Sequence, residues 1–145
     1  MAATITAIPT PDLSHLKRDD WERVYEPSED TFALLDALEM DSEWIKSSQP
    51  NVVFEIGSGS GCVSAFIASI LHSRCVYFTS DINTHANQAT ISTGDLNGCN
   101  LNTINTHLLN GTRLDGAVDI LLFNPPMVWW ELRDGSYRAG TVRST

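Results

Sequence analysis

A glycine-rich turn between two apolar segments is the first part of the sequence that could do chemistry. Residues 57–61 read Gly-Ser-Gly-Ser-Gly and lie between an apolar run, 52–56, and a second one that begins at Cys62. Glycines there permit positive φ and let a ligand approach the backbone closely, and a following helix would present free N–H groups. Asp81 ends the next apolar run, where its carboxylate could accept both hydroxyls of a ribose. The pattern predicts a nucleotide-type ligand, and a tight turn that binds nothing is the alternative.

An Asn-Pro-Pro turn supplies a second set of candidate groups. Asn124, Pro125 and Pro126 directly follow the apolar run 118–123. The two prolines fix φ and remove two backbone donors, so the Asn124 side-chain oxygen and the Pro125 carbonyl remain as acceptors. Two acceptors can hold the two hydrogens of a planar –NH₂ group and aim its nitrogen at an electrophile. This arrangement favours methyl transfer to an amide or exocyclic amine, with these three residues as the catalytic set. The alternative is a rigid strand-end turn without catalysis.

Glu55, just before the glycines, indicates which nucleotide ligand the turn would hold. A carboxylate beside a pyrophosphate would repel it, whereas the same carboxylate would attract a cationic amino-acid group. Together with the Asn-Pro-Pro turn, this favours S-adenosylmethionine over a dinucleotide. The same two features argue against a nicotinamide-dependent dehydrogenase.

These groups need a scaffold that brings the ends of several strands together. Apolar periodicity predicts strands over 52–56, 75–79, 105–109 and 118–123, and helices over 31–38, 62–72 and 84–96. Such alternation predicts an α/β fold, a Rossmann-like parallel sheet of about four strands with flanking helices. Ligands bind beyond the carboxyl ends of these strands, where Asp81 and Asn124 lie. The expected organisation is a flexible leader, 1–20, a partial methyltransferase domain, 21–126, and an atypical tail, 127–145.

Four segments, taken in order, resemble a known family. They are Val24-Tyr25-Glu26-Pro27-Ser28-Glu29-Asp30-Thr31-Phe32, Glu55-x-Gly57-x-Gly59-x-Gly61, Asp81-Ile82-Asn83 and Phe123-Asn124-Pro125-Pro126. This series resembles the HemK-type class I methyltransferases, and its first segment resembles the eukaryotic HemK2 branch in particular. The resemblance runs from about residue 22 to 126, which is most of the chain.

The resemblance implies S-adenosylmethionine-dependent N-methylation of the glutamine in the Gly-Gly-Gln motif of a translation release factor. Protein lysine and DNA adenine are alternative acceptors within the same family. A small zinc-binding activator subunit that covers an apolar edge is implied as the partner in a heterodimer. By matching positions, the resemblance implies a cofactor site made of Tyr25, Thr31, Glu55, Gly57, Gly59, Asp81, Asn110 and Asn124.

Three departures from the family pattern bear on activity. Met127 stands where the family has a Tyr that packs on the planar target group, and Met offers no flat ring. Asn110 stands where an Asp usually contacts adenine, so a weaker contact is expected. The family continues with further strands beyond the Asn-Pro-Pro turn, so the sequence predicts a sheet truncated after its fourth strand. A catalytically inactive truncated isoform is therefore the alternative interpretation.

The tail has an unusual composition. It places Trp129 beside Trp130 and shows no evident alternation. Reading Met-Val-Trp-Trp-Glu (127–131) in a frame shifted by one nucleotide gives Trp-x-Gly-Gly, a stretch that the family carries soon after its Asn-Pro-Pro-Tyr. We hypothesise that the tail is out of frame. Continuous in-frame genomic DNA across codons 124–130 would contradict this.

Composition sets limits on partners and setting. The net charge is −9 with a pI near 4.6, which argues against nucleic acid because phosphate contacts need clustered Lys and Arg. No apolar run approaches a membrane span, and the first residues do not read as a secretory signal. The three cysteines, Cys62, Cys75 and Cys99, form no CxxC motif, and the four histidines do not cluster. We therefore expect no metal site. We also expect a reducing compartment, either the cytoplasm or the nucleus.

Overall fold

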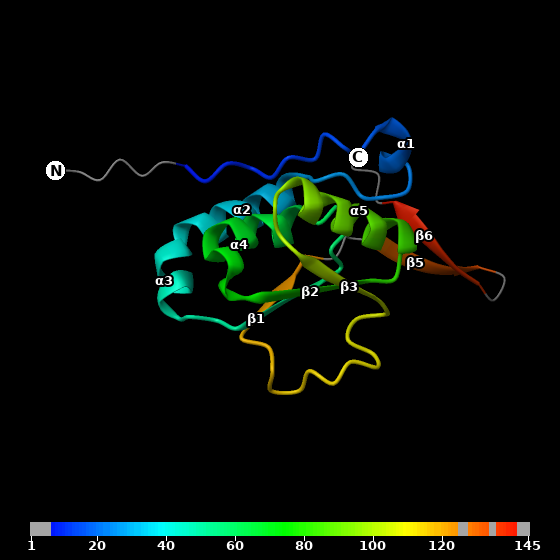
Figure 1. The fold of residues 1–145 in the computed structure, drawn as a ribbon. Coiled ribbons are helices and arrows are strands. Elements are labelled where there is room, and N and C mark those ends of the chain that lie inside the picture. The colour runs from blue at the N-terminus through cyan, green and yellow to red at the C-terminus, as the bar shows by residue number, and fades with distance from the viewer. Residues whose placement is uncertain (1–6, 125–127, 134–135, 142–145) are drawn as a thin grey trace.

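The computed structural model describes residues 7–124, 128–133 and 136–141. Within these ranges the chain forms a four-stranded parallel sheet, in the order β3-β2-β1-β4, and a separate two-stranded antiparallel sheet (Figure 1). The parallel strands are β1 (Val52–Ile56), β2 (Val76–Asp81), β3 (Leu101–Asn105) and β4 (Ile120–Phe123). The predicted α/β fold with about four parallel strands is confirmed.

Helices cover one face of this sheet. On that side Figure 1 shows α2 (Glu29–Met40), α3 (Ser42–Ser47), α4 (Cys62–Leu71) and α5 (Thr84–Leu96). The short α1 (Arg18–Trp21) precedes them, and a 3₁₀ turn, His72–Arg74, follows α4. α4 connects β1 to its parallel neighbour β2, and α5 connects β2 to β3, so the chain contains two consecutive βαβ units.

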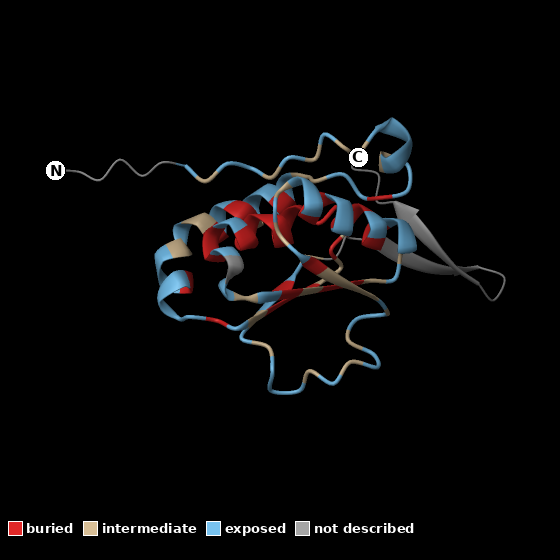
Figure 2. Cartoon of the chain, in the orientation of Figure 1, coloured by how far each residue is buried: buried red, intermediate tan, exposed pale blue. Residues whose placement is uncertain are grey.

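The core lies between these helices and the sheet, as the buried residues in Figure 2 show. Val53, Tyr77 and Leu101 are register neighbours on β1, β2 and β3, and all three are buried. Phe66 and Ile67 of α4 pack in the same apolar cluster. Removing this apolar surface from water is the main stabilising term of the fold.

The opposite face of the sheet is apolar, and in the described part of the chain only a loop crosses it (Figure 1). The rings of Phe54 and Phe78 stack there with centroids 6.4 Å apart. The loop 106–119 runs over this face, where Ser80 Oγ donates to the Leu108 carbonyl at 2.8 Å. Along β4, Leu121 and Phe123 remain 53% and 58% exposed.

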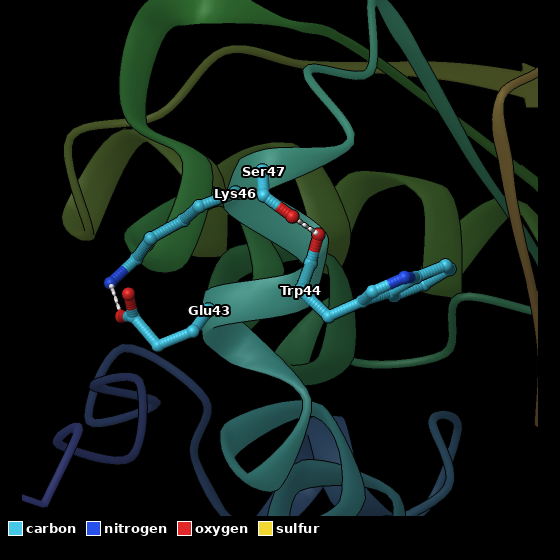
Figure 3. A network of polar contacts seen from close by, with 4 residues as sticks. All are labelled: Glu43, Trp44, Lys46 and Ser47. Carbon is cyan, nitrogen blue, oxygen red and sulfur yellow. Dashed lines mark hydrogen bonds and ion pairs between the residues drawn. The ribbon is translucent and has the colours of Figure 1, made fainter.

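α3 carries an exposed tryptophan at the far end of the helical layer. Figure 3 shows that the Trp44 ring points away from the helix, and 70% of the residue is exposed. On the same helix Lys46 Nζ lies 2.8 Å from Glu43 Oε1, and Ser47 Oγ donates to the Trp44 carbonyl at 2.8 Å. The ion pair is solvent-exposed, so its contribution to stability is small.

Several elements differ from their predicted limits. β3 occupies Leu101–Asn105 rather than 105–109, and the predicted segment lies in the loop, with Leu108 at φ 53°. α3 was not predicted. The tail, described from its sequence as atypical and without predicted strands, contains β5 (Val128–Arg133) and β6 (Ser136–Thr141), which pair antiparallel.

The segment expected to be a flexible leader makes specific hydrogen bonds over its described part. The Ile8 N–H donates to Glu39 Oε1 on α2 at 2.7 Å. Further along, the Asp12 N–H donates to Asn97, the residue directly after α5, and His15 bonds to Thr93 of α5. Residues 7–16 therefore form a strap across the helical layer (Figure 1).

Candidate functional site

The carboxyl ends of β1, β2 and β4 surround a cavity of about 200 Å³. This is the edge at which ligands bind open α/β sheets. Six residues predicted from the sequence line the cavity: Tyr25, Thr31, Gly57, Gly59, Asp81 and Asn124. They come from four separate stretches of the sequence, and the fold brings them together.

The glycine turn between β1 and α4 is built from left-handed backbone positions. Gly57, Gly59 and Gly61 have φ values of 75°, 55° and 81°. A Cβ at Gly61 would lie 2.9 Å from the Thr90 Cα, so this glycine allows the turn to pack against α5. A Cβ at Gly59 would meet nothing within 4 Å, so the turn leaves open space beside the cavity that Gly59 lines.

Asp81 links the end of β2 to this turn. Its Oδ2 accepts the Gly59 N–H at 3.0 Å, and its Oδ1 accepts the Asn83 N–H at 2.9 Å. A carboxylate oxygen can accept more than one hydrogen bond. Each oxygen therefore retains acceptor capacity toward the cavity, which fits a ligand with a pair of hydroxyls.

Glu55 is placed differently from the sequence prediction. It lies on the helix-covered face of β1, is 1% exposed, and accepts a hydrogen bond from Ser64 Oγ. Burial raises the pKa of Glu55 to about 8, against the lowering effect of the Ser64 hydrogen bonds, and the charge of Asp81 raises it slightly further. The structure does not place Glu55 among the residues that line the cavity, because the alternation of β1 turns it toward α4.

Asn124 follows β4 directly and reaches the cavity opposite the glycine turn. Its Nδ2 lies 3.5 Å from Thr31 Oγ1, at the long limit of a hydrogen bond. With Nδ2 directed at the hydroxyl, Oδ1 is the acceptor left for a ligand. Thr31 Oγ1 also accepts the Ser28 N–H at 3.3 Å, so the start of α2 holds the hydroxyl in place.

Two other predicted site residues, Pro125 and Pro126, lie outside the described residues, as does Met127, and a third, Asn110, does not line the cavity. Asn110 is exposed in the loop 106–119, where its carbonyl accepts from Thr106 Oγ1 at 2.8 Å. The match of Asn110 to the end of the third strand was wrong, because β3 ends at Asn105 and Thr106 follows it.

The cavity also contains residues that the sequence analysis did not place in the site. Asn83 and Ala86, at the start of α5, face it, as does Cys62 at the start of α4. Burial raises the pKa of the Cys62 thiol to about 11, so it is a neutral wall group and not a nucleophile near pH 7. Asn83 could have been inferred from its position two residues after Asp81.

Among the described residues, no three His, Cys, Asp or Glu side chains gather as metal ligands would. None of the helices in the described ranges has the length and hydropathy needed to cross a bilayer.

Comparison with known proteins finds similar methyltransferases. No family model matches the chain. The mouse protein Methyltransferase HEMK2 is 43% identical over 124 residues, which cover 84% of this chain and 57% of the mouse protein. The Schizosaccharomyces pombe protein named eRF1 methyltransferase catalytic subunit mtq2 is 43% identical, over 93% of this chain and 64% of its own length. Over most of its own length the chain is thus similar to HemK2 methyltransferases.

The human Methyltransferase HEMK2 gives the same result, with 42% identity over 82% of this chain and 56% of the human protein. The chain thus spans between 56% and 64% of the length of these HemK2 relatives. A proposed RNA methyltransferase from Pyrococcus horikoshii shares the fold, with a TM-score of 0.56 at 18% identity, over 79% of this chain and 56% of that one. The class I methyltransferase fold inferred from the sequence is confirmed.

Proposed function

We propose that this chain acts in S-adenosylmethionine-dependent N-methylation of the glutamine amide in the Gly-Gly-Gln motif of a translation release factor. The observation that carries this is the position of Asn124, which faces the same cavity as the glycine turn and Asp81. The name of the Schizosaccharomyces pombe relative, an eRF1 methyltransferase, supports the same substrate.

The residues of the cavity suit S-adenosylmethionine, which when bound supplies a methyl group activated on a sulfonium. Asp81 would accept the ribose hydroxyls, because both of its oxygens have acceptor capacity beyond their bonds to Gly59 and Asn83. Gly59 leaves room for the ligand. Tyr25 and Thr31 close the opposite side of the cavity.

Asn124 would orient the substrate amide. Its Oδ1 accepts one N–H of the glutamine –NH₂ group, and the Pro125 carbonyl is proposed to accept the other. Holding the glutamine nitrogen close to the methyl group and correctly oriented raises the rate of methyl transfer. No strong general base is required, which agrees with a cavity whose Cys62 thiol is neutral.

A partner subunit is part of this proposal. The relative mtq2 is named a catalytic subunit. We propose that this chain likewise pairs with a small zinc-binding activator, and that a release-factor substrate places the pair in the cytoplasm. The net charge of −9 disfavours duplex DNA as the acceptor.

The direct test is a methyl-transfer assay on the chain co-expressed with the activator. A release-factor domain carrying Gly-Gly-Gln should accept label from S-adenosylmethionine, whereas the same domain with Gln replaced by Ala should not. Lysine peptides and duplex DNA are the competing acceptors. Label on either of these, and none on the release factor, would overturn the proposal.

Asn124→Ala should lower the rate by roughly 100-fold or more, because the amide loses its orienting acceptor. The matched control is Asn100→Ala, since Asn100 is exposed and does not line the cavity. Equal rates for the two variants would remove Asn124 from the mechanism.

A further inference from the structure

The N-terminal strap reaches the glycine turn through a chain of hydrogen bonds. Thr93 of α5 is 0% exposed, and its Oγ1 donates to the Ser60 carbonyl at 2.6 Å. His15 Nε2 lies 3.2 Å from the same Oγ1. A hydroxyl has one proton, so Thr93 must accept from His15, which fixes the ring as the tautomer protonated on Nε2.

The other ring nitrogen agrees with this assignment. His15 Nδ1 is buried and has no hydrogen-bond partner within the described ranges. The hydrogen bond to Thr93 is therefore the polar contact that orients the imidazole. The resulting order is His15 to Thr93 to Ser60, from strap to helix to turn.

A second contact ties the strap to the same threonine. Asn97 Nδ2 donates to the Thr93 carbonyl at 2.8 Å and to the Asp12 carbonyl at 2.9 Å. Asn97 Oδ1 accepts the Asp12 N–H at 2.8 Å. The segment from Asp12 to His15 is thus held at one end by Asn97, which bonds to Thr93, and at the other end by Thr93 itself.

Thr90, which lies three residues before Thr93 on α5, also supports the glycine turn. Its Oγ1 is 2.9 Å from Ser58 Oγ and 3.2 Å from the Gly59 carbonyl. Together the two buried threonines fix three consecutive residues of the turn, Ser58 to Ser60. Only Thr93 also contacts the strap.

We propose that His15 is a positioning residue for the candidate cofactor site, acting through Thr93 on the carbonyl of Ser60. Without the His15 donor, the Thr93 hydroxyl can rotate, and the turn loses one of the groups that fix its backbone. The consequence for ligand affinity rests on the proposed function; the consequence for the turn itself does not.

The test compares a variant that removes the donor with one that replaces it. His15→Leu removes the N–H, whereas His15→Gln can present an amide N–H at similar reach. Amide hydrogen exchange by NMR would be measured at Gly59 and Gly61, whose N–H groups bond to Asp81 and Ser58. Binding of S-adenosylhomocysteine would be measured by calorimetry on the same samples, with thermal melts to report overall stability.

We expect His15→Leu to speed exchange at the turn and to weaken binding roughly threefold to tenfold, as the loss of one hydrogen bond would. His15→Gln should restore both, and His107→Gln, at an exposed loop histidine, should leave both at the wild-type values. Thr93→Val should reproduce His15→Leu, and the double variant should be no worse than Thr93→Val.

Three results would overturn the proposal: unchanged exchange in His15→Leu, a His15→Gln variant as impaired as His15→Leu, or additive losses in the double variant. If the wild-type chain does not bind S-adenosylhomocysteine while exchange still depends on His15, the proposed function fails and the positioning role stands.

Discussion

At the scale of single residues, Glu55 is a carboxyl next to the glycine turn that does not line the cavity. It is fully buried beside Ser64, and burial raises its pKa to about 8. Near pH 7 most of it is therefore neutral. The sequence-based expectation that its charge attracts a cationic group does not describe the ligand-free chain.

This predicts a pH dependence of stability. The folded-state pKa of about 8 is above the ordinary value of 4.5, so the folded chain binds more protons than the unfolded chain between these values. The free energy of unfolding should therefore fall as pH rises from about 5 to 8, by on the order of a few kcal/mol. Glu55→Gln should remove this slope and leave the chain more stable than wild type at pH 8.

Urea denaturation at several pH values measures this directly. Glu22→Gln, at an exposed position, is the control and should keep the wild-type slope. A Glu55→Gln variant with the same slope as wild type would show that Glu55 is ionised throughout the range.

Single residues also show how much of the candidate site could be predicted from the sequence. Gly57, Gly59, Asp81 and Asn124 were predicted because each belongs to a motif placed directly after a predicted strand. Asn83 was missed because an asparagine after a strand is also an ordinary helix cap, and it does cap α5 through its bond to the His85 N–H.

At the scale of elements, two glycines of the turn between β1 and α4 serve different purposes. Gly61 allows close packing against α5, and Gly59 leaves open space beside the cavity. Gly61→Ala should destabilise the fold, since its Cβ would lie 2.9 Å from Thr90 Cα and its φ is 81°. Gly59→Ala meets no atom within 4 Å and carries only the strain of φ 55°, about 1 kcal/mol. Its added methyl group enters the open space beside the cavity.

We therefore expect Gly61→Ala to lose more stability than Gly59→Ala, and Gly59→Ala to lose more ligand affinity than its stability loss would explain. Chemical denaturation should find Gly61→Ala the less stable variant by about 1–3 kcal/mol. Calorimetry with S-adenosylhomocysteine should find that Gly59→Ala loses affinity out of proportion to its small loss of stability. If the two variants rank the same way in both experiments, the division between packing and ligand space is wrong.

The elements predicted well were those whose burial leaves a pattern. β1 is buried on both faces and is mostly apolar, and α4 is almost entirely buried. β3 is an edge strand with one buried residue, Leu101, so its sequence carries little signal, and the adjacent residues 105–109 contain as many apolar residues as the strand itself. The hairpin β5–β6 had one local cue, Asp134-Gly135 between its strands.

At the scale of the whole molecule, the sheet is covered by helices on one side only within the described residues. Parallel sheets ordinarily have both faces covered. Here Leu121 pairs in register with Phe54, and Phe123 with Ile56, so these four side chains form a continuous apolar strip beside β4. Phe54 is fully buried, whereas Leu121 and Phe123 stay more than half exposed.

Such a strip should bind a hydrophobic dye. Anilinonaphthalene sulfonate fluorescence should rise on addition of the folded chain, and Leu121→Ser with Phe123→Ser should reduce that rise several-fold. Because both side chains are already largely exposed, the double variant should keep most of its stability, which a thermal melt would verify. Met40→Ser is the matched control, since Met40 is 86% exposed but lies alone at the end of α2. Equal dye binding by the wild type and the folded double variant would contradict the prediction that this strip binds the dye.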